Sequence, residues 1–171
     1  MKAFRLFLRV IDSVSEWSGK LVAWIIIPLI VGMVFSTIVR FALGHSPLWT
    51  YDFAYMLGGS FFMLGAAYTL RLRYHVRIDM LYGRWPPRMK AAIDVFFGLL
   101  FFFPILIWLW LHSIEHAMFS WQIKERAVES VLRSIVYPFK TVIPVAILLL
   151  LLQGVAEFLR SLFALVRGRE P

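Results

Sequence analysis

The sequence predicts an all-α, polytopic membrane protein with four transmembrane helices, cytoplasmic N- and C-termini and an amphipathic helix before the first span. Composition is the first indication, because 61% of the 171 residues are hydrophobic and only 16% are charged. Soluble domains are nearer half apolar and a quarter charged. The second indication is that the apolar residues form four long runs, and the third is that most Lys and Arg residues lie on one side of those runs. Without internal repeats or a linker, residues 1–171 are predicted to form a single membrane domain.

Residues 1–20 are predicted to form an interfacial amphipathic helix. Apolar side chains recur there at spacings of three and four, at Phe4, Phe7, Leu8, Ile11, Val14 and Trp17. Charged residues lie between them, and such a helix rests on anionic lipid with its aromatic face in the headgroup region. The alternative is that this segment is simply the start of a tilted first span.

The four spans are expected at residues 21–43, 49–70, 93–111 and 141–158. Each is close to the 20 apolar residues that cross a bilayer, and each must be helical because lipid offers no partner for backbone amides. The first run is too long for a signal-peptide core and lacks a small-residue cleavage motif, so we expect it to be retained. Prolines within the spans, at Pro28, Pro104 and Pro144, are expected to kink their helices.

The orientation follows from the distribution of positive charge. The N-terminal segment, the loop after the second span and the C-terminal tail together carry 13 of the 18 Lys and Arg residues. Cytoplasmic loops are enriched in these residues, so both termini are predicted to be cytoplasmic. Residues 44–48 and 112–137 would then face the periplasm or the exterior.

Several function classes lack the residues that they need. The chain has no Cys, which excludes disulfides, thiolate metal sites and Cys nucleophiles. It has no phosphate-binding glycine loop, nucleophile elbow or His-Glu-x-x-His run, so we predict neither enzyme activity nor a cofactor. Basic residues flank the spans, where lipid phosphates are better partners than nucleic acid. No ionisable group is expected at mid-membrane depth, which argues against substrate conduction by this chain alone.

A haem-binding or redox membrane-anchor subunit is the alternative function. Four His residues are present, but His112 and His116 share one helix, whereas axial haem ligands normally come from two. The spacing of His112, Glu115 and His116 would also allow a metal site, although an exposed polar helix end explains these residues equally well.

The second span carries features of close packing. Small residues form a strip for helix association, at Ala54, Gly58, Gly59, Gly65, Ala66 and Ala67. Ser46 and Pro47 resemble a helix cap and first-turn proline, with Asp52 near the positive end of the helix.

A polar cluster follows the same span. Arg71, His75 and Asp79 are spaced four apart, so a continuing helix would place them on one stripe where acidic and basic groups can pair. The stripe would be either a solvated basic collar that enforces topology or a docking surface for another membrane subunit.

The order of these motifs resembles a known transporter family. The relevant segments are Gly65-Ala66-Ala67-Tyr68-Thr69-Leu70-Arg71, His75-Val76-Arg77-Ile78-Asp79 and Trp85-Pro86-Pro87-Arg88. A closing segment adds Glu129-Ser130, Tyr137-Pro138, Lys140-Thr141, Ile143-Pro144-Val145 and Leu152-Gln153. Over residues 20–160 the chain resembles the small integral membrane subunit (Q subunit, DctQ family) of tripartite ATP-independent periplasmic (TRAP) transporters.

The resemblance implies a scaffold role. In that family a large membrane subunit carries the substrate and sodium sites, and a periplasmic binding protein delivers the substrate. This chain would be the fixed partner in sodium-coupled uptake of organic acids by an elevator-like movement of the large subunit. Its expected partners are the large subunit, the binding protein and membrane lipids.

The same resemblance selects candidate residues. Subunit-interface or structural roles are expected for Asp52, Arg71, His75, Asp79, Glu129, Pro144 and Gln153. At Asp52 the family more commonly has Glu, which is longer by one methylene. The cations Lys124, Arg126 and Arg133 are expected to dock the binding protein, because they lie on the side from which it arrives.

Overall fold

The computed structural model describes residues 2–72, 86–128, 130 and 132–167, and most of these residues are helical. Four helical stretches are long and apolar enough to cross a membrane, which confirms the predicted all-α class with four spans. Their bounds exceed the predicted ones at several ends, because polar residues continue the helices beyond the apolar runs.

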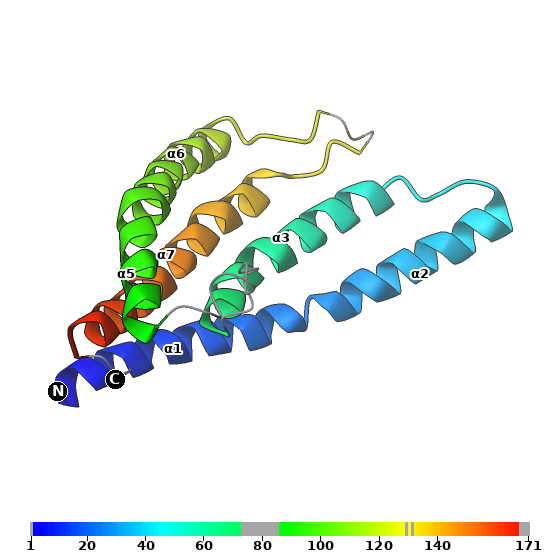
Figure 1. Cartoon of the computed structure of the whole chain (residues 1–171). Coiled ribbons are helices and arrows are strands. Elements are labelled where there is room, and N and C mark those ends of the chain that lie inside the picture. The colour runs from blue at the N-terminus through cyan, green and yellow to red at the C-terminus, as the bar shows by residue number, and fades with distance from the viewer. Residues whose placement is uncertain (1, 73–85, 129, 131, 168–171) are drawn as a thin grey trace.

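The first span is a long helix with one break. Helix α1 (Lys2–Ala23) is followed by α2 (Ile26–Leu43) in nearly the same direction (Figure 1). Pro28 has no N–H for the carbonyl of Trp24, which accepts instead from the Ile27 N–H at 3.3 Å. The helix is therefore interrupted at Trp24 and Ile25, one turn before Pro28, without a large change of direction. Helix α2 ends at Gly44, whose φ of 75° is the left-handed cap that glycine adopts readily.

Helix α3 (Thr50–Arg71) returns beside α2, and the hydroxyls of Ser36 and Thr50 lie 2.7 Å apart across this contact. Its start differs from the expected cap at Ser46. A turn closed by the Thr50 N–H and the Pro47 carbonyl at 3.1 Å comes first, so the helix begins only at Thr50. Asp52 lies in the first turn of the helix, as expected, and its carboxylate is buried.

The third span is bent. It consists of α5 (Pro87–Phe97), a π-helical turn η1 (Gly98–Phe102) and α6 (Phe103–Gln122). The Phe103 N–H donates to the Gly98 carbonyl in η1, immediately before Pro104, and such turns often accompany a proline bend. The helix extends well beyond the predicted end at residue 111, so His112 and His116 are helical.

The last helix, α7 (Tyr137–Arg167), lies at the centre of the molecule. It packs against α5 and α6 on one side and against α3 on the other, while α2 packs chiefly against α3 (Figure 1). Helices α2, α3, α7 and α6 thus follow one another side by side as a layer, and α1 lies against both α3 and α7. Many of the buried apolar residues are accordingly small, among them Ala67, Ala117, Ala146 and Ala156.

Helix α1 packs against both α3 and α7. Leu8 and Ile11 are buried with Ala156 of α7, whereas Phe7 and Trp17 remain exposed. The single apolar face predicted for residues 1–20 thus divides into an inward and an outward part. Helix α1 continues the direction of α2 (Figure 1), and both expectations for residues 1–20, an interfacial helix and the start of a tilted first span, stay predictions.

Candidate subunit interface and its polar anchors

A buried carboxylate fastens the loop before α7 to the start of α3. Asp52 is 6% exposed and its Oδ2 accepts hydrogen bonds from the hydroxyls of Ser130 and Ser134. The Ser130 hydroxyl in turn accepts from the Leu132 N–H at 3.2 Å. We call Asp52, Ser130 and Ser134 the outer cluster. Because a buried charge is costly without partners, this cluster holds the loop in a defined position.

The same loop is organised as a hairpin. Arg126 and Ile135 form an antiparallel bridge, and the Ala127 N–H donates to the Ser134 carbonyl at 2.9 Å. We call the described residues of this segment, 125–128, 130 and 132–136, the outer hairpin. Lys124 and Arg133 adopt left-handed backbone conformations, with φ of 47° and 48°.

The predicted docking cations lie on or beside this hairpin. Lys124, Arg126 and Arg133 are all exposed. All three are therefore accessible to a partner protein, and their role in docking stays a prediction. Glu129, the other candidate in this segment, lies outside the described residues.

An ion pair joins the outer hairpin to α7. Lys140 Nζ lies 2.7 and 2.6 Å from the two carboxylate oxygens of Glu125. The hydrogen bond from Lys140 holds the pKa of Glu125 below its ordinary value of 4.5. Nothing in the local sequence pattern around Lys140 indicates this partner.

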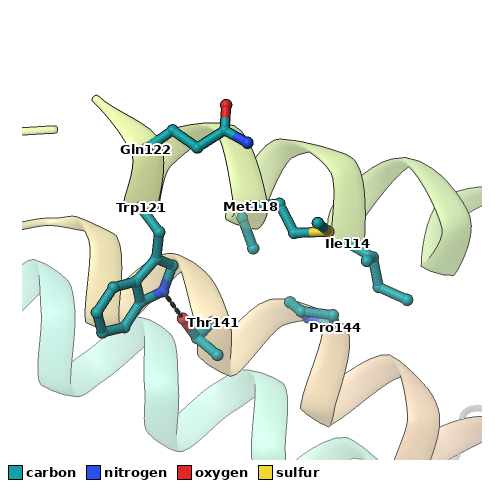
Figure 2. Close-up of a pocket in the computed structure, with 7 residues that line it drawn as sticks. Ile114, Met118, Trp121, Gln122, Thr141 and Pro144 are labelled. Atoms are coloured by element: carbon teal, nitrogen blue, oxygen red, sulfur yellow. Dashed lines mark hydrogen bonds between the residues drawn. The ribbon is translucent and has the colours of Figure 1, made fainter. Parts of the chain in front are cut away.

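Helices α6 and α7 enclose a shallow apolar groove of about 370 Å³. Figure 2 shows the indole of Trp121 donating across one end of it to the Thr141 hydroxyl, at 2.8 Å. Pro144 is buried and lies in the floor of the groove, and α7 remains helical across it. The candidate Pro144 therefore shapes the contact between α6 and α7.

At the other end of the layer, Gln153 is fully buried between α7 and α1. Its Oε1 accepts from the Ser15 hydroxyl at 2.7 Å, and its Nε2 donates to Asp12 at 3.3 Å. Arg160 bridges Asp12 and Glu157. We call Asp12, Ser15, Gln153, Glu157 and Arg160 the inner cluster.

The sequence identified Gln153 through the family resemblance but missed Ser15. The spacing could have indicated that Ser15 faces inward, because it follows the buried residues Leu8 and Ile11 by seven and four positions and so shares their helix face. The Ser15 hydroxyl gives the buried Gln153 amide a hydrogen-bond partner, and buried polar groups are nearly always hydrogen-bonded.

Arg71 is the described member of the predicted Arg71, His75 and Asp79 stripe. Its guanidinium lies 2.8 Å from Glu16 of α1, and Lys20 pairs with the same carboxylate at 2.7 Å. Arg71 thus joins α3 to α1 within the chain. His75 and Asp79 lie outside the described residues, so their pairing stays a prediction.

The haem alternative gains no support from the described residues. His112 is exposed, its Nδ1 lies 3.0 Å from the Trp108 carbonyl, and its ring packs on Trp108 with centroids 4.3 Å apart. Within the part of the chain that the structure describes, no group of three His, Cys, Asp or Glu side chains could hold a metal ion.

Comparison with protein families gives a match over most of the chain. Residues 29–164 match the family described as "Tripartite ATP-independent periplasmic transporters, DctQ component". The matched range runs from α2 to α7 and includes the outer cluster, the outer hairpin and the α7 half of the inner cluster. Comparisons with curated proteins and with solved structures find no match.

Proposed function

Because this chain belongs to the DctQ family, and is therefore a small membrane component of a TRAP transporter, we propose that it is the fixed scaffold of that transporter. It supports a large membrane subunit that moves in an elevator-like manner during sodium-coupled uptake of organic acids. A periplasmic binding protein delivers the substrate. The complex resides in the inner membrane of a bacterium.

One observation carries the proposal, namely the layer of helices fastened at both ends. The outer cluster joins α3 to the outer hairpin, and the inner cluster joins α1 to α7. Such cross-links oppose sliding of the helices past one another, which suits a stationary support. In the described spans charged side chains lie toward the helix ends, as at Arg40 and Asp52, and this supports a scaffold more than a carrier.

The first experiment is co-purification combined with reconstituted transport. A tagged chain purified from membranes that also express the large subunit should retain that subunit in equal amount. Proteoliposomes containing both subunits should take up a carboxylate when supplied with binding protein and a sodium gradient. Uptake by this chain alone would contradict the scaffold role, and so would its purification without a large subunit.

The second experiment addresses the outer hairpin. We infer that Lys124, Arg126 and Arg133 attract an acidic surface of the binding protein, because all three are exposed cations on the outer side. Charge reversal by Arg126→Glu with Arg133→Glu should raise the half-saturating concentration of binding protein, since complementary charge accelerates association. Arg88→Glu, at an exposed position on the opposite side, is the matched control. An unchanged concentration in the double variant would contradict this docking role.

A further inference from the structure

The end of helix α6 contains a buried hydroxyl that belongs to neither the outer nor the inner cluster. Ser120 is fully buried, and within the part of the chain that the structure describes its Oγ forms no hydrogen bond of good geometry. Ser113 on the same helix differs, because its hydroxyl donates to the Trp110 carbonyl at 2.7 Å. A buried hydroxyl without an acceptor is costly, so an acceptor for Ser120 is expected close by.

The backbone at this helix end brings Glu125 back towards Ser120. The Glu125 N–H donates to the Ser120 carbonyl at 3.0 Å, and the Lys124 N–H donates to the Trp121 carbonyl at 3.3 Å. Lys124 has a left-handed φ of 47°. These two bonds and the left-handed residue make up a Schellman motif, in which the side chains at the positions of Ser120 and Glu125 frequently touch.

That side-chain contact is normally apolar, whereas here its two members are a serine and a glutamate. The hydrogen bond from Lys140 is the main reason why the pKa of Glu125 lies below 4.5, and the Ser120 hydroxyl is the next contributor. The charge of His116 also acts on this carboxylate. The Glu125 carboxylate is therefore the acceptor within reach of the Ser120 hydroxyl.

The turn at Lys124 determines where the outer hairpin begins. Glycine is the usual residue at this position of the motif, and a lysine adopts the left-handed conformation only at a cost. The contacts that Glu125 makes immediately after the turn offset this cost. They also fix the direction in which the chain leaves α6 towards the exposed Arg126.

We propose that Ser120 is a positioning residue for the outer hairpin, and that its hydroxyl donates a hydrogen bond to the Glu125 carboxylate while Lys140 binds the same carboxylate from α7. The first residue of the hairpin is thereby tied to two helices. This role concerns the chain by itself. Its effect on the binding protein rests on the proposed function, because it presumes that the hairpin docks that protein.

The sign of one substitution tests the hydrogen bond. If the Ser120 hydroxyl had no acceptor, Ser120→Ala would leave the thermal midpoint unchanged or raise it, because a buried unpaired group is removed. We expect the midpoint to fall by several degrees, since a hydrogen bond to a charged group is lost. Ser113→Ala is the matched control on the same helix and should have a smaller effect. A midpoint of Ser120→Ala at or above that of the wild type would overturn the proposal.

A double-mutant cycle distinguishes this bond from a general loss of packing. In the Glu125→Gln background the charged acceptor is absent, so Ser120→Ala should lower the midpoint by less than half as much as it does in the wild type. Ser113→Ala should have the same effect in both backgrounds. An equal loss for Ser120→Ala in the two backgrounds would overturn the bond to Glu125.

The acid profile gives a readout that packing alone would not change. Because the Ser120 hydroxyl contributes to the lowered pKa of Glu125, its removal raises that pKa towards 4.5. The stabilisation by Glu125 is lost as the pH falls through this pKa, so Ser120→Ala should lose it at a higher pH than the wild type. An acid profile that did not move would contradict the contact.

Spin labels report the position of the hairpin. The chain has no native Cys, and labels at Val128→Cys in the hairpin and Phe41→Cys near the end of α2 occupy highly exposed positions. Electron paramagnetic resonance should give a broader distribution of the distance between the labels in Ser120→Ala than in Ser113→Ala or the wild-type background. An unchanged distribution would overturn the positioning role.

Transport measurements separate this inference from the proposed function. In reconstituted transporter, Ser120→Ala should raise the half-saturating concentration of binding protein and leave the rate at saturation unchanged. If Arg126→Glu with Arg133→Glu had no effect on that concentration, the docking role would be contradicted, while the thermal and distance measurements would still decide the role of Ser120. If only the arginine variant raised it, the contribution of Ser120 to docking would be overturned.

Discussion

Asp52 shows how a single residue can be noticed in a sequence while its role is missed. The sequence singled out Asp52 by its place near a helix start and by the family resemblance. A favourable interaction with the positive helix end was enough to explain it. The structure instead directs the carboxylate to two serines about 80 positions later in the chain. Local patterns cannot show such a partner, because the contact depends on how α3 and the outer hairpin meet in space.

Removal of the Asp52 carboxylate should loosen the outer hairpin. In Asp52→Ala, two hydroxyls that the carboxylate now binds lose their acceptor, and hydrogen bonds to charged groups contribute about 1.5–3 kcal/mol each. We expect a lower thermal-unfolding midpoint in detergent, measured by size-exclusion chromatography after heating. Ser134→Ala removes only one donor and should have a smaller effect. Equal midpoints for Asp52→Ala and the wild type would contradict the anchoring role.

The Glu125–Lys140 pair predicts a pH dependence with a defined sign. Because Lys140 holds the pKa of Glu125 below 4.5, folding favours the ionised carboxylate. The stabilisation is fully present above about pH 4.5 and is lost as the pH falls through the lowered pKa. The thermal midpoints of wild type and Glu125→Gln should therefore differ at neutral pH and converge in acid. A difference that stayed constant across the whole acid range in which carboxylates are protonated would exclude this carboxylate as the cause.

At the scale of helices, the sequence showed the small-residue strip of α3 but did not show which helix packs against each part of it. Gly59 meets Phe139 of α7 and Ala67 is fully buried, whereas nothing lies within 4 Å of a Cβ built at Gly58 or Gly65. Composition shows that a helix can be approached closely, but not by which neighbour. The division of α1 into an inward and an outward apolar face was missed for the same reason.

Glycine substitutions test the seating of aromatic rings between helices. Gly19→Ala should separate α1 from α3, because the new Cβ would lie 2.4 Å from Cγ of Tyr68, at the root of the side chain. We expect a loss of about 1–3 kcal/mol, as overpacking typically causes. Gly58→Ala is the matched control and should be neutral or slightly stabilising, because it favours the helix and meets no atom. Equal thermal stability of the two variants would contradict the close packing of Tyr68 on Gly19.

For the whole molecule, the number of spans and their order along the chain followed from hydropathy, whereas their lateral arrangement did not. Hydropathy reports depth in the membrane, since it reflects transfer from water to lipid. It contains no information on which helix lies beside which. The position of α7 between α3 on one side and α5 and α6 on the other is known only from the contacts between helices.

The predicted orientation can be tested on the intact chain, which has no native Cys. Val128→Cys, at a position 94% exposed in the outer hairpin, should react with a membrane-impermeant maleimide added to intact cells whose outer membrane is permeabilised. Val166→Cys, 74% exposed near the end of α7, should react only after the inner membrane is opened. Labelling of both residues from the same side would contradict a chain with cytoplasmic termini.

The central place of α7 has a consequence for biosynthesis. Ribosomes deliver helices in order, so α1 to α6 enter the membrane before the helix that lies between them has been made. Until α7 arrives, α3 and α6 lack their shared neighbour, and Asp12 and Ser15 lack the Gln153 and Arg160 side chains that pair with them. Insertion of this last segment therefore completes the architecture in one late step. A nascent chain truncated before Tyr137 would present two unjoined halves, which are the kind of substrate that membrane quality-control proteases remove.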